Sequence, residues 1–168
     1  FGAFRKGDKS RRMSLIQVEH ITAARQVLCR RDFKEFIRAV QPDYVFNWHH
    51  LVLIDALQRL ADRKFERLIV MMPPRHGKSQ LVSRLFPAWA FARNRQEQII
   101  LSSYSLDLAS AMNRDCQRII TGDDYRRLFP ETRLNERNET AAVRNNHRFD
   151  IVGESGYFIA AGVGGGIT

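Results

Sequence analysis

The residues best suited to chemistry are a run at 73–79 that reads Pro-Pro-Arg-His-Gly-Lys-Ser. A Gly-Lys-Ser tripeptide predicts a loop that binds the phosphates of a nucleotide when it joins a buried strand to a helix. Gly77 would let the backbone approach the phosphates closely, since any Cβ there would crowd them. Lys78 can reach the β- and γ-phosphates, and the Ser79 hydroxyl can ligate Mg²⁺.

The loop departs from the standard phosphate-binding pattern, GxxxxGK[ST]. Met72 stands where that pattern has its first glycine. A bare Gly-Lys-Ser also occurs by chance, and the alternative interpretation is a solvated turn with an exposed lysine. The position of the tripeptide favours the phosphate loop, because Pro73 and Pro74 fix the entry of the chain. Arg75 and His76 add cationic or hydrogen-bonding groups to the loop itself.

Short apolar runs alternate with helical patterns on both sides of this loop. Leu68–Met72 is typical of a doubly buried parallel strand, and Ile99–Ser103 follows it after a helix of about 15 residues. This spacing predicts a βαβ unit with a right-handed crossover. A further helix is expected at about Ser105–Thr121, followed by strands at Arg148–Val152 and Tyr157–Ala161. The sequence therefore predicts an α/β fold.

Helical patterns precede the first strand. Asp32-Phe33-Lys34-Glu35 has the form of a capping box, and Pro42 would end the helix that it starts. Another helix is expected from Asn47, as N-cap, to about Asp62. The first of these helices would bury Phe33, Phe36, Ile37 and Val40, and the second would bury Leu51, Ile54, Leu57 and Ala61.

Composition narrows the class of protein. The 168 residues suit one ordinary domain, and no apolar run approaches the roughly 20 residues that cross a bilayer. Two distant cysteines, Cys29 and Cys116, exclude a disulfide framework and favour a reducing compartment. The net charge of +9 favours a polyanionic partner. Residues 1–12 carry +4 of it, and they could be an added or upstream tail before a native start at Met13.

Three segments taken together resemble the ATPase domain of large terminase subunits, the motors that package DNA into tailed-phage capsids. They are RLIVMMPPRHGKSQLVS, IILSSYSLDLASAMNRDCQRII and YFIAAGVGGGIT, and the resemblance covers roughly Phe46 to Thr168. It implies a P-loop NTPase-type three-layer sandwich with a mostly parallel sheet, preceded by an N-terminal helical segment. We expect residues 13–66 to form that segment and residues 67–168 to form the ATPase core.

The resemblance also implies roles for individual residues. Lys78 and Arg75 would be catalytic, with Arg75 sensing or stabilising the γ-phosphate or else only positioning phosphate. Pro74, Arg75, His76, Gly77, Lys78 and Ser79 would bind ATP, and Ser79 would hold Mg²⁺. Trp48 and His49 fall where the family places its adenine-binding segment. The alternative is that Trp48 belongs to the core and that Asn47 merely caps a helix.

Other candidate residues carry weaker signals. Ser102–Ser105 could face a ligand at the end of a strand or cap the next helix. The glycines of 162–166 lack a following lysine, so a tight strand connection is expected there rather than a second phosphate loop. His20, His50 and His147 show no metal-binding spacing, so surface or packing roles are expected.

The resemblance further implies partners and limits. Double-stranded DNA, a portal protein, a small terminase subunit and further copies of the chain in a ring would be the partners, in the cytoplasm of a bacterial host and without a membrane. The carboxylates of the family's next strand and its nuclease domain are expected beyond residue 168, so the core would be incomplete at its C-terminus, with little hydrolysis by itself. Two other functions stay open, a helicase-like P-loop ATPase and a non-hydrolysing nucleotide- or DNA-binding module.

Overall fold

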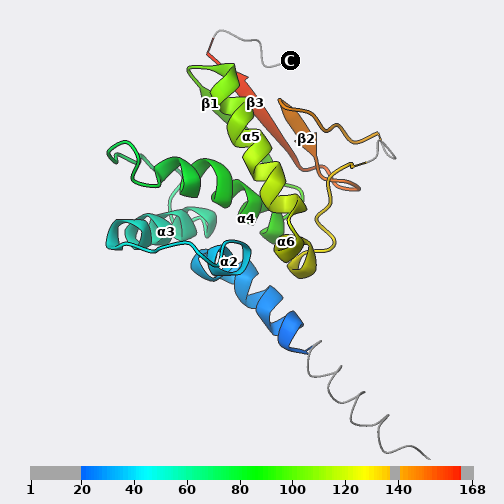
Figure 1. Ribbon diagram of the computed structural model, residues 1–168, viewed down its shortest axis with the longest axis horizontal. Coiled ribbons are helices and arrows are strands. Elements are labelled where there is room, and N and C mark those ends of the chain that lie inside the picture. The colour runs from blue at the N-terminus through cyan, green and yellow to red at the C-terminus, as the bar shows by residue number, and fades with distance from the viewer. Residues whose placement is uncertain (1–19, 137–140, 164–168) are drawn as a thin grey trace, which may run out of the picture.

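The computed structural model describes residues 20–136 and 141–163 (Figure 1). The proposed tail at 1–12 and the glycines at 164–166 lie outside these residues. A helix over residues 20–31 leads into a group of helices, and a small sheet lies at the opposite end (Figure 1). The molecule is an α/β protein with three strands in the described part.

Two capped helices precede the candidate loop. Helix α2 (Phe33–Val40) begins after Asp32, whose Oδ1 accepts a hydrogen bond from the Glu35 N–H at 3.0 Å, as the capping box predicts. Helix α3 (Trp48–Ala61) has Asn47 at its N-cap and Asp62 at its C-cap, at the predicted positions.

The predicted buried face of α3 is partly wrong. Ile54 and Leu57 are buried as expected, but Leu51 is 39% exposed and Leu53 takes its place in the core. His50 is also buried on this side of the helix. The buried stripe is therefore rotated by about one residue, because His50, Leu53, Ile54 and Leu57 share the face at helical spacing.

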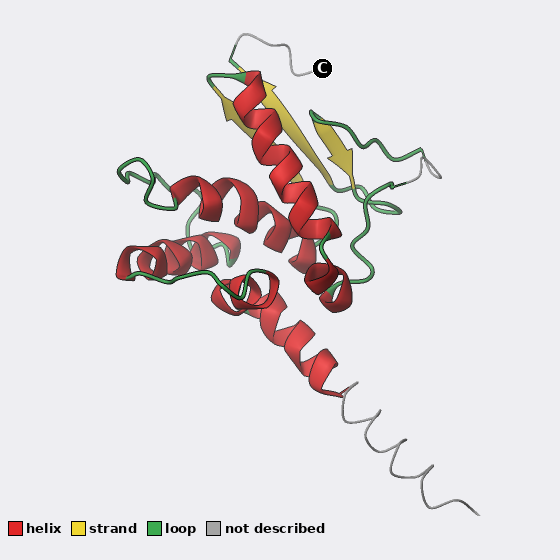
Figure 2. Cartoon of the chain, viewed as in Figure 1, coloured by secondary structure: helices red, strands yellow, loops and turns green. Residues whose placement is uncertain are grey.

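The sheet has the strand order β1-β3-β2. Strand β1 (Gln98–Ser103) pairs in parallel with β3 (Tyr157–Gly162), and β2 (Arg148–Asp150) pairs antiparallel with β3. Helix α5 (Leu106–Thr121) and the short helix α6 (Asp123–Leu128) lie between β1 and β2 in the chain. Helix α5 runs along the front of the sheet and packs on β1 and β3 (Figure 2). These elements match the predicted segments from residue 99 onward.

The first predicted strand does not join this sheet. Residues 67–73 are assigned to no strand, and Leu68–Met72 is not doubly buried. Exposure alternates along the segment, because Ile69 and Met71 are 84% and 89% exposed while Leu68, Val70 and Met72 pack against the core. The expected βαβ unit through this segment is therefore absent from the described residues. The parallel pair that does form is β1 with β3.

The helix after the loop changes pitch. It begins at Lys78, widens into a π-helical stretch η1 (Gln80–Leu85) and continues as α4 (Phe86–Arg93). Pro87 stands in the first turn of α4. Proline has no N–H and its ring crowds the carbonyl four residues earlier, so the i→i+5 bonding of η1 accommodates it. A proline inside a helical pattern is expected to kink the helix or begin a new one, and α4 does begin at the residue before Pro87.

Aromatic rings form the centre of the helical core. Phe33 packs against Trp89 with ring centroids 4.9 Å apart, and Tyr125 packs against Phe129 at 5.1 Å. The Trp89 indole N–H donates to the Cys29 carbonyl at 2.8 Å, and the Tyr125 hydroxyl donates to the Ala88 carbonyl at 3.0 Å. Both buried polar groups are thereby satisfied.

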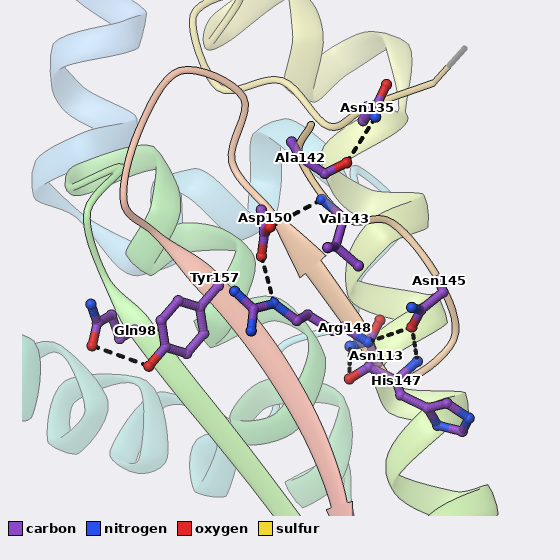
Figure 3. Close-up of polar contacts among 10 residues, drawn as sticks. All are labelled: Gln98, Asn113, Asn135, Ala142, Val143, Asn145, His147, Arg148, Asp150 and Tyr157. Carbon is purple, nitrogen blue, oxygen red and sulfur yellow. Dashed lines mark hydrogen bonds and ion pairs between the residues drawn. The ribbon is translucent and has the colours of Figure 1, made fainter. Parts of the chain in front are cut away.

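A polar network holds β2 and its preceding loop on the sheet (Figure 3). The Asp150 carboxylate accepts from Arg148 Nε at 2.8 Å and from the Val143 N–H at 3.0 Å. The Asn145 side chain accepts from two successive backbone N–H groups, those of His147 and Arg148. Among the described residues, no helix is long and apolar enough to cross a membrane.

Candidate functional site

The loop at 73–77 leads directly into a helix. Lys78 is the first helical residue, and the Gly77 carbonyl accepts from the Leu81 N–H at 3.0 Å. Arg75 and Gly77 have positive φ angles of 63° and 77°. The first N–H groups of a helix have no intrahelical partner and lie at its positive dipole end, so Lys78 and Ser79 stand where an anion is favoured.

Gly77 lies against a wall built from the segment before α3 and from α3 itself. A Cβ on Gly77 would lie 2.7 Å from Nε2 of His50 and 3.4 Å from the hydroxyl of Tyr44. No side chain fits in that space, and the positive φ also disfavours one. The sequence pattern assigns Gly77 to phosphate approach, whereas the structure shows a second reason for glycine at this position.

Three histidines gather beside the loop. The ring centroids of His49 and His50 are 4.1 Å apart, and those of His49 and His76 are 5.8 Å apart. Nδ1 of His76 lies 2.8 Å from the Pro74 carbonyl, which folds this ring back over its own loop. Loss of hydration lowers the pKa of the His49 imidazole, and the neighbouring imidazoles of His50 and His76 lower it further.

Two permanent cations complete this group. Arg75 is exposed and Lys78 is half-buried. Within the described ranges, neither forms an ion pair with a carboxylate. Their charge is therefore available to an anion that binds at the helix start.

The helix that carries Lys78 is anchored at several points. Leu81 and Leu85 are completely buried. Arg84 Nε donates to Asp115 Oδ2 at 2.7 Å, which ties η1 to α5. Gln80 Nε2 donates to Gln41 Oε1 at 3.1 Å, just after α2. The helix that follows the loop is therefore held in place, and a preorganised binding loop needs such a support.

The adenine-site candidates lie next to the loop. Trp48 is 77% exposed, so the alternative that places it in the core is wrong. Its ring meets the His49 ring edge-on, with centroids 5.6 Å apart. Asn47 does occupy the N-cap, so that half of the alternative is confirmed. An exposed indole beside an imidazole can stack on a planar base.

The other candidates fall outside this group. Ser105 is the N-cap residue of α5, without a side-chain capping bond, and Tyr104 is 82% exposed. His147 Nδ1 lies 3.0 Å from the Ser110 hydroxyl, a packing role as expected. Gly162 ends β3, where a Cβ would lie 2.9 Å from the Leu106 backbone nitrogen.

The residues at the loop fit a nucleotide with Mg²⁺. The cations Arg75 and Lys78 stand at the start of the helix, and neither has a carboxylate partner among the described residues. No group of three or more His, Cys, Asp or Glu side chains that could hold a metal ion occurs in residues 20–136 and 141–163. Mg²⁺ commonly uses one or two protein ligands and completes its shell with substrate phosphates and water. Ser79 would be the ligand from this loop.

A comparison with models of protein families shows to which family the chain belongs. The model described as terminase large subunit, T4likevirus-type, N-terminal, matches residues 69–159, more than half of the chain. The chain belongs to this family of terminase large subunits. No curated protein and no solved structure gives a significant match.

The match bears on the site in two ways. It includes the whole candidate loop of the terminase chain, together with η1, α4, β1, α5 and the first half of β3. Trp48 and His49 precede the matched residues. Family membership supports a role in phage DNA packaging, while the assignment of an adenine site depends on the geometry described above.

The wall behind the terminase loop was not predicted from the sequence. Tyr44 and His50 precede Gly77 by about thirty residues, and nothing in their spacing indicates that they meet it. The local signal was an aromatic and histidine-rich run, Tyr44–His50, which extends into the first turn of α3.

Proposed function

We propose that this terminase chain binds ATP with Mg²⁺ at the 73–79 loop and that hydrolysis drives double-stranded DNA into a capsid. The observation that carries the proposal is Lys78 at the first position of a helix, directly after a left-handed glycine. A lysine ammonium and free helix N–H groups are the combination that binds the β- and γ-phosphates in phosphate-loop proteins. The P-loop-type sandwich belongs to the same proposal, since residues 68–72 alternate in exposure as a strand does.

The individual roles follow from position. Lys78 would neutralise the terminal phosphates, Ser79 would ligate Mg²⁺, and the loop backbone at Pro74, His76 and Gly77 would surround the phosphates. Arg75, exposed and without a carboxylate partner in the described ranges, would contact the γ-phosphate. Trp48 and His49 would hold the adenine.

The partners proposed for the whole motor follow from the family. They are double-stranded DNA, a portal protein, a small terminase subunit and further copies of this chain, in the cytoplasm of an infected bacterium. Net positive charge suits contacts to DNA phosphates that carry no sequence information.

Substitution of Lys78 tests the proposal. Lys78→Ala removes a cation that supports no described hydrogen bond, so the fold should stay intact while binding of a non-hydrolysable ATP analogue is lost. Calorimetric titration gives the affinity, and thermal unfolding checks the fold. Lys64→Ala, at an exposed lysine, is the matched control and should bind as the wild type does. Equal affinity in Lys78→Ala and wild type would refute the assignment.

Activity assays separate the related functions. DNA-stimulated ATPase activity together with packaging of DNA into empty capsids supports the motor. ATP-dependent strand separation without packaging supports a helicase-like enzyme. Nucleotide binding without turnover supports a non-hydrolysing module.

A further inference from the structure

The hydroxyl of Tyr44 is a buried polar group without a hydrogen-bond partner among residues 20–136 and 141–163. Its oxygen is shielded from solvent and makes no hydrogen bond within the described part of the chain. Burial raises the pKa of this phenol, so the hydroxyl keeps its proton and remains a donor at neutral pH. Buried donors without acceptors are rare in native proteins, because each one loses its bonds to water without compensation.

The surroundings hold this hydroxyl in place. The Tyr44 ring packs against Phe46 with centroids 5.0 Å apart and against His50 at 5.4 Å. The Tyr44 backbone N–H donates to the Gln41 carbonyl at 3.0 Å, which fixes the chain just after α2. The phenol therefore cannot easily turn toward water.

The hydroxyl is adjacent to the phosphate loop. It lies 3.4 Å from the Cβ position of Gly77. The second polar atom at this wall, His50 Nε2, belongs to a ring whose Nδ1 already accepts from the Asn47 N–H at 3.2 Å. The loop backbone beside this hydroxyl is left-handed at Arg75 and Gly77.

We propose that Tyr44 is a positioning residue of the phosphate loop, whose hydroxyl bonds to the loop backbone only when the loop has closed on bound phosphates. The inference rests on the proposed ATP function and adds a residue to it. The missing hydrogen bond of the empty protein becomes part of the free energy of nucleotide binding. Tyr44 would thereby couple the end of α2 to the occupancy of the loop.

The test compares a partly buried tyrosine, Tyr44, with a fully buried one, Tyr125, because their hydroxyl groups differ in hydrogen bonding. The Tyr44 hydroxyl has no hydrogen-bond partner in the part of the chain that the structure describes, whereas the Tyr125 hydroxyl donates to the Ala88 carbonyl at 3.0 Å. Each is changed to phenylalanine. The melting temperature without nucleotide and the affinity for a magnesium complex of a non-hydrolysable ATP analogue are measured for both variants and the wild type.

The two variants should behave in opposite ways. Tyr44→Phe should leave the melting temperature of the empty protein unchanged or higher and should weaken nucleotide binding about three- to tenfold. Tyr125→Phe should lower the melting temperature and bind nucleotide within about twofold of the wild type.

Three results would contradict the inference. Wild-type affinity in Tyr44→Phe overturns it. A lower melting temperature of empty Tyr44→Phe also overturns it, because the hydroxyl would then be satisfied in the empty protein. A wild type that binds no nucleotide refutes the proposed function itself, and the role of Tyr44 falls with it.

Discussion

Nε2 of His50 lies 2.7 Å from the point that a Cβ on Gly77 would occupy. The imidazole is buried, and its Nδ1 accepts from the Asn47 N–H at the start of α3. The ring therefore cannot move aside without disturbing the first turn of that helix. Helix α3 and the 73–79 loop are in this way fitted to each other through one glycine.

Gly77→Ala should disable the site and destabilise the protein. A non-glycine residue in left-handed backbone costs about 1–2 kcal/mol, and the new methyl group would also displace His50. We expect loss of binding of an ATP analogue and a lower free energy of unfolding. Calorimetric titration and denaturant unfolding measure the two effects.

Gly153→Ala is the matched control for this prediction. Gly153 has nearly the same φ, 78°, but a Cβ there would meet nothing within 4 Å. The control carries the backbone strain without the clash. Gly77→Ala should also lower the free energy of unfolding by less in a protein that carries His50→Ala, because the imidazole that the new Cβ would meet is then absent. Equal losses at both glycines would show that His50 does not restrict the loop.

Trp48→Ala should weaken binding of ATP without affecting the fold. Its side chain is 77% exposed, so its removal opens no cavity. Stacking of a base on an aromatic ring contributes about 1–3 kcal/mol, so a loss of about tenfold in affinity is expected. Inorganic triphosphate, which has no base, should bind equally to both proteins. A similar loss for triphosphate would place Trp48 at the phosphates and remove the adenine assignment.

Local signals in the sequence predicted local structure well. Asp32 and Asn47 mark helix starts because capping depends on neighbouring backbone groups, and the structure places both at N-caps. Strands β1 and β3 form where apolar runs are bounded by turn residues. Lys78 opens a helix, as a phosphate loop requires. The prediction of a strand at Leu68–Met72 is wrong for the described residues. A strand needs a hydrogen-bonding neighbour, and an apolar run alone does not supply one.

Non-local features could not be predicted in the same way. The π-helical stretch at Gln80–Leu85 could not be predicted from helical periodicity, because the pattern of apolar residues does not distinguish i→i+4 from i→i+5 bonding. The approach of Tyr44 and His50 to Gly77 depends on how the chain returns after α3. Such contacts are a property of the fold, and only the structure brings these residues together.

The response to nucleotide should depend on pH through His49. Its pKa is lowered in the empty protein, so below about pH 6.5 the unfolded chain binds the proton more readily than the folded protein. The contribution of His49 to the free energy of unfolding, without nucleotide, is therefore complete above that pH and is lost as the pH falls. Bound phosphates would favour the protonated imidazole and reverse this effect.

The rise in melting temperature caused by an ATP analogue should accordingly grow as the pH falls from 7.5 to 5.5. His49→Gln keeps a polar side chain without the proton equilibrium, so it should reduce this pH dependence, while His147→Gln, at a histidine that contacts Ser110 on α5, should leave it unchanged. Thermal unfolding with and without the analogue at each pH measures the effect. The same rise at every pH in the wild type would mean that His49 does not sense the phosphates, because a group whose charge interacts with a bound anion must take up protons as the anion binds.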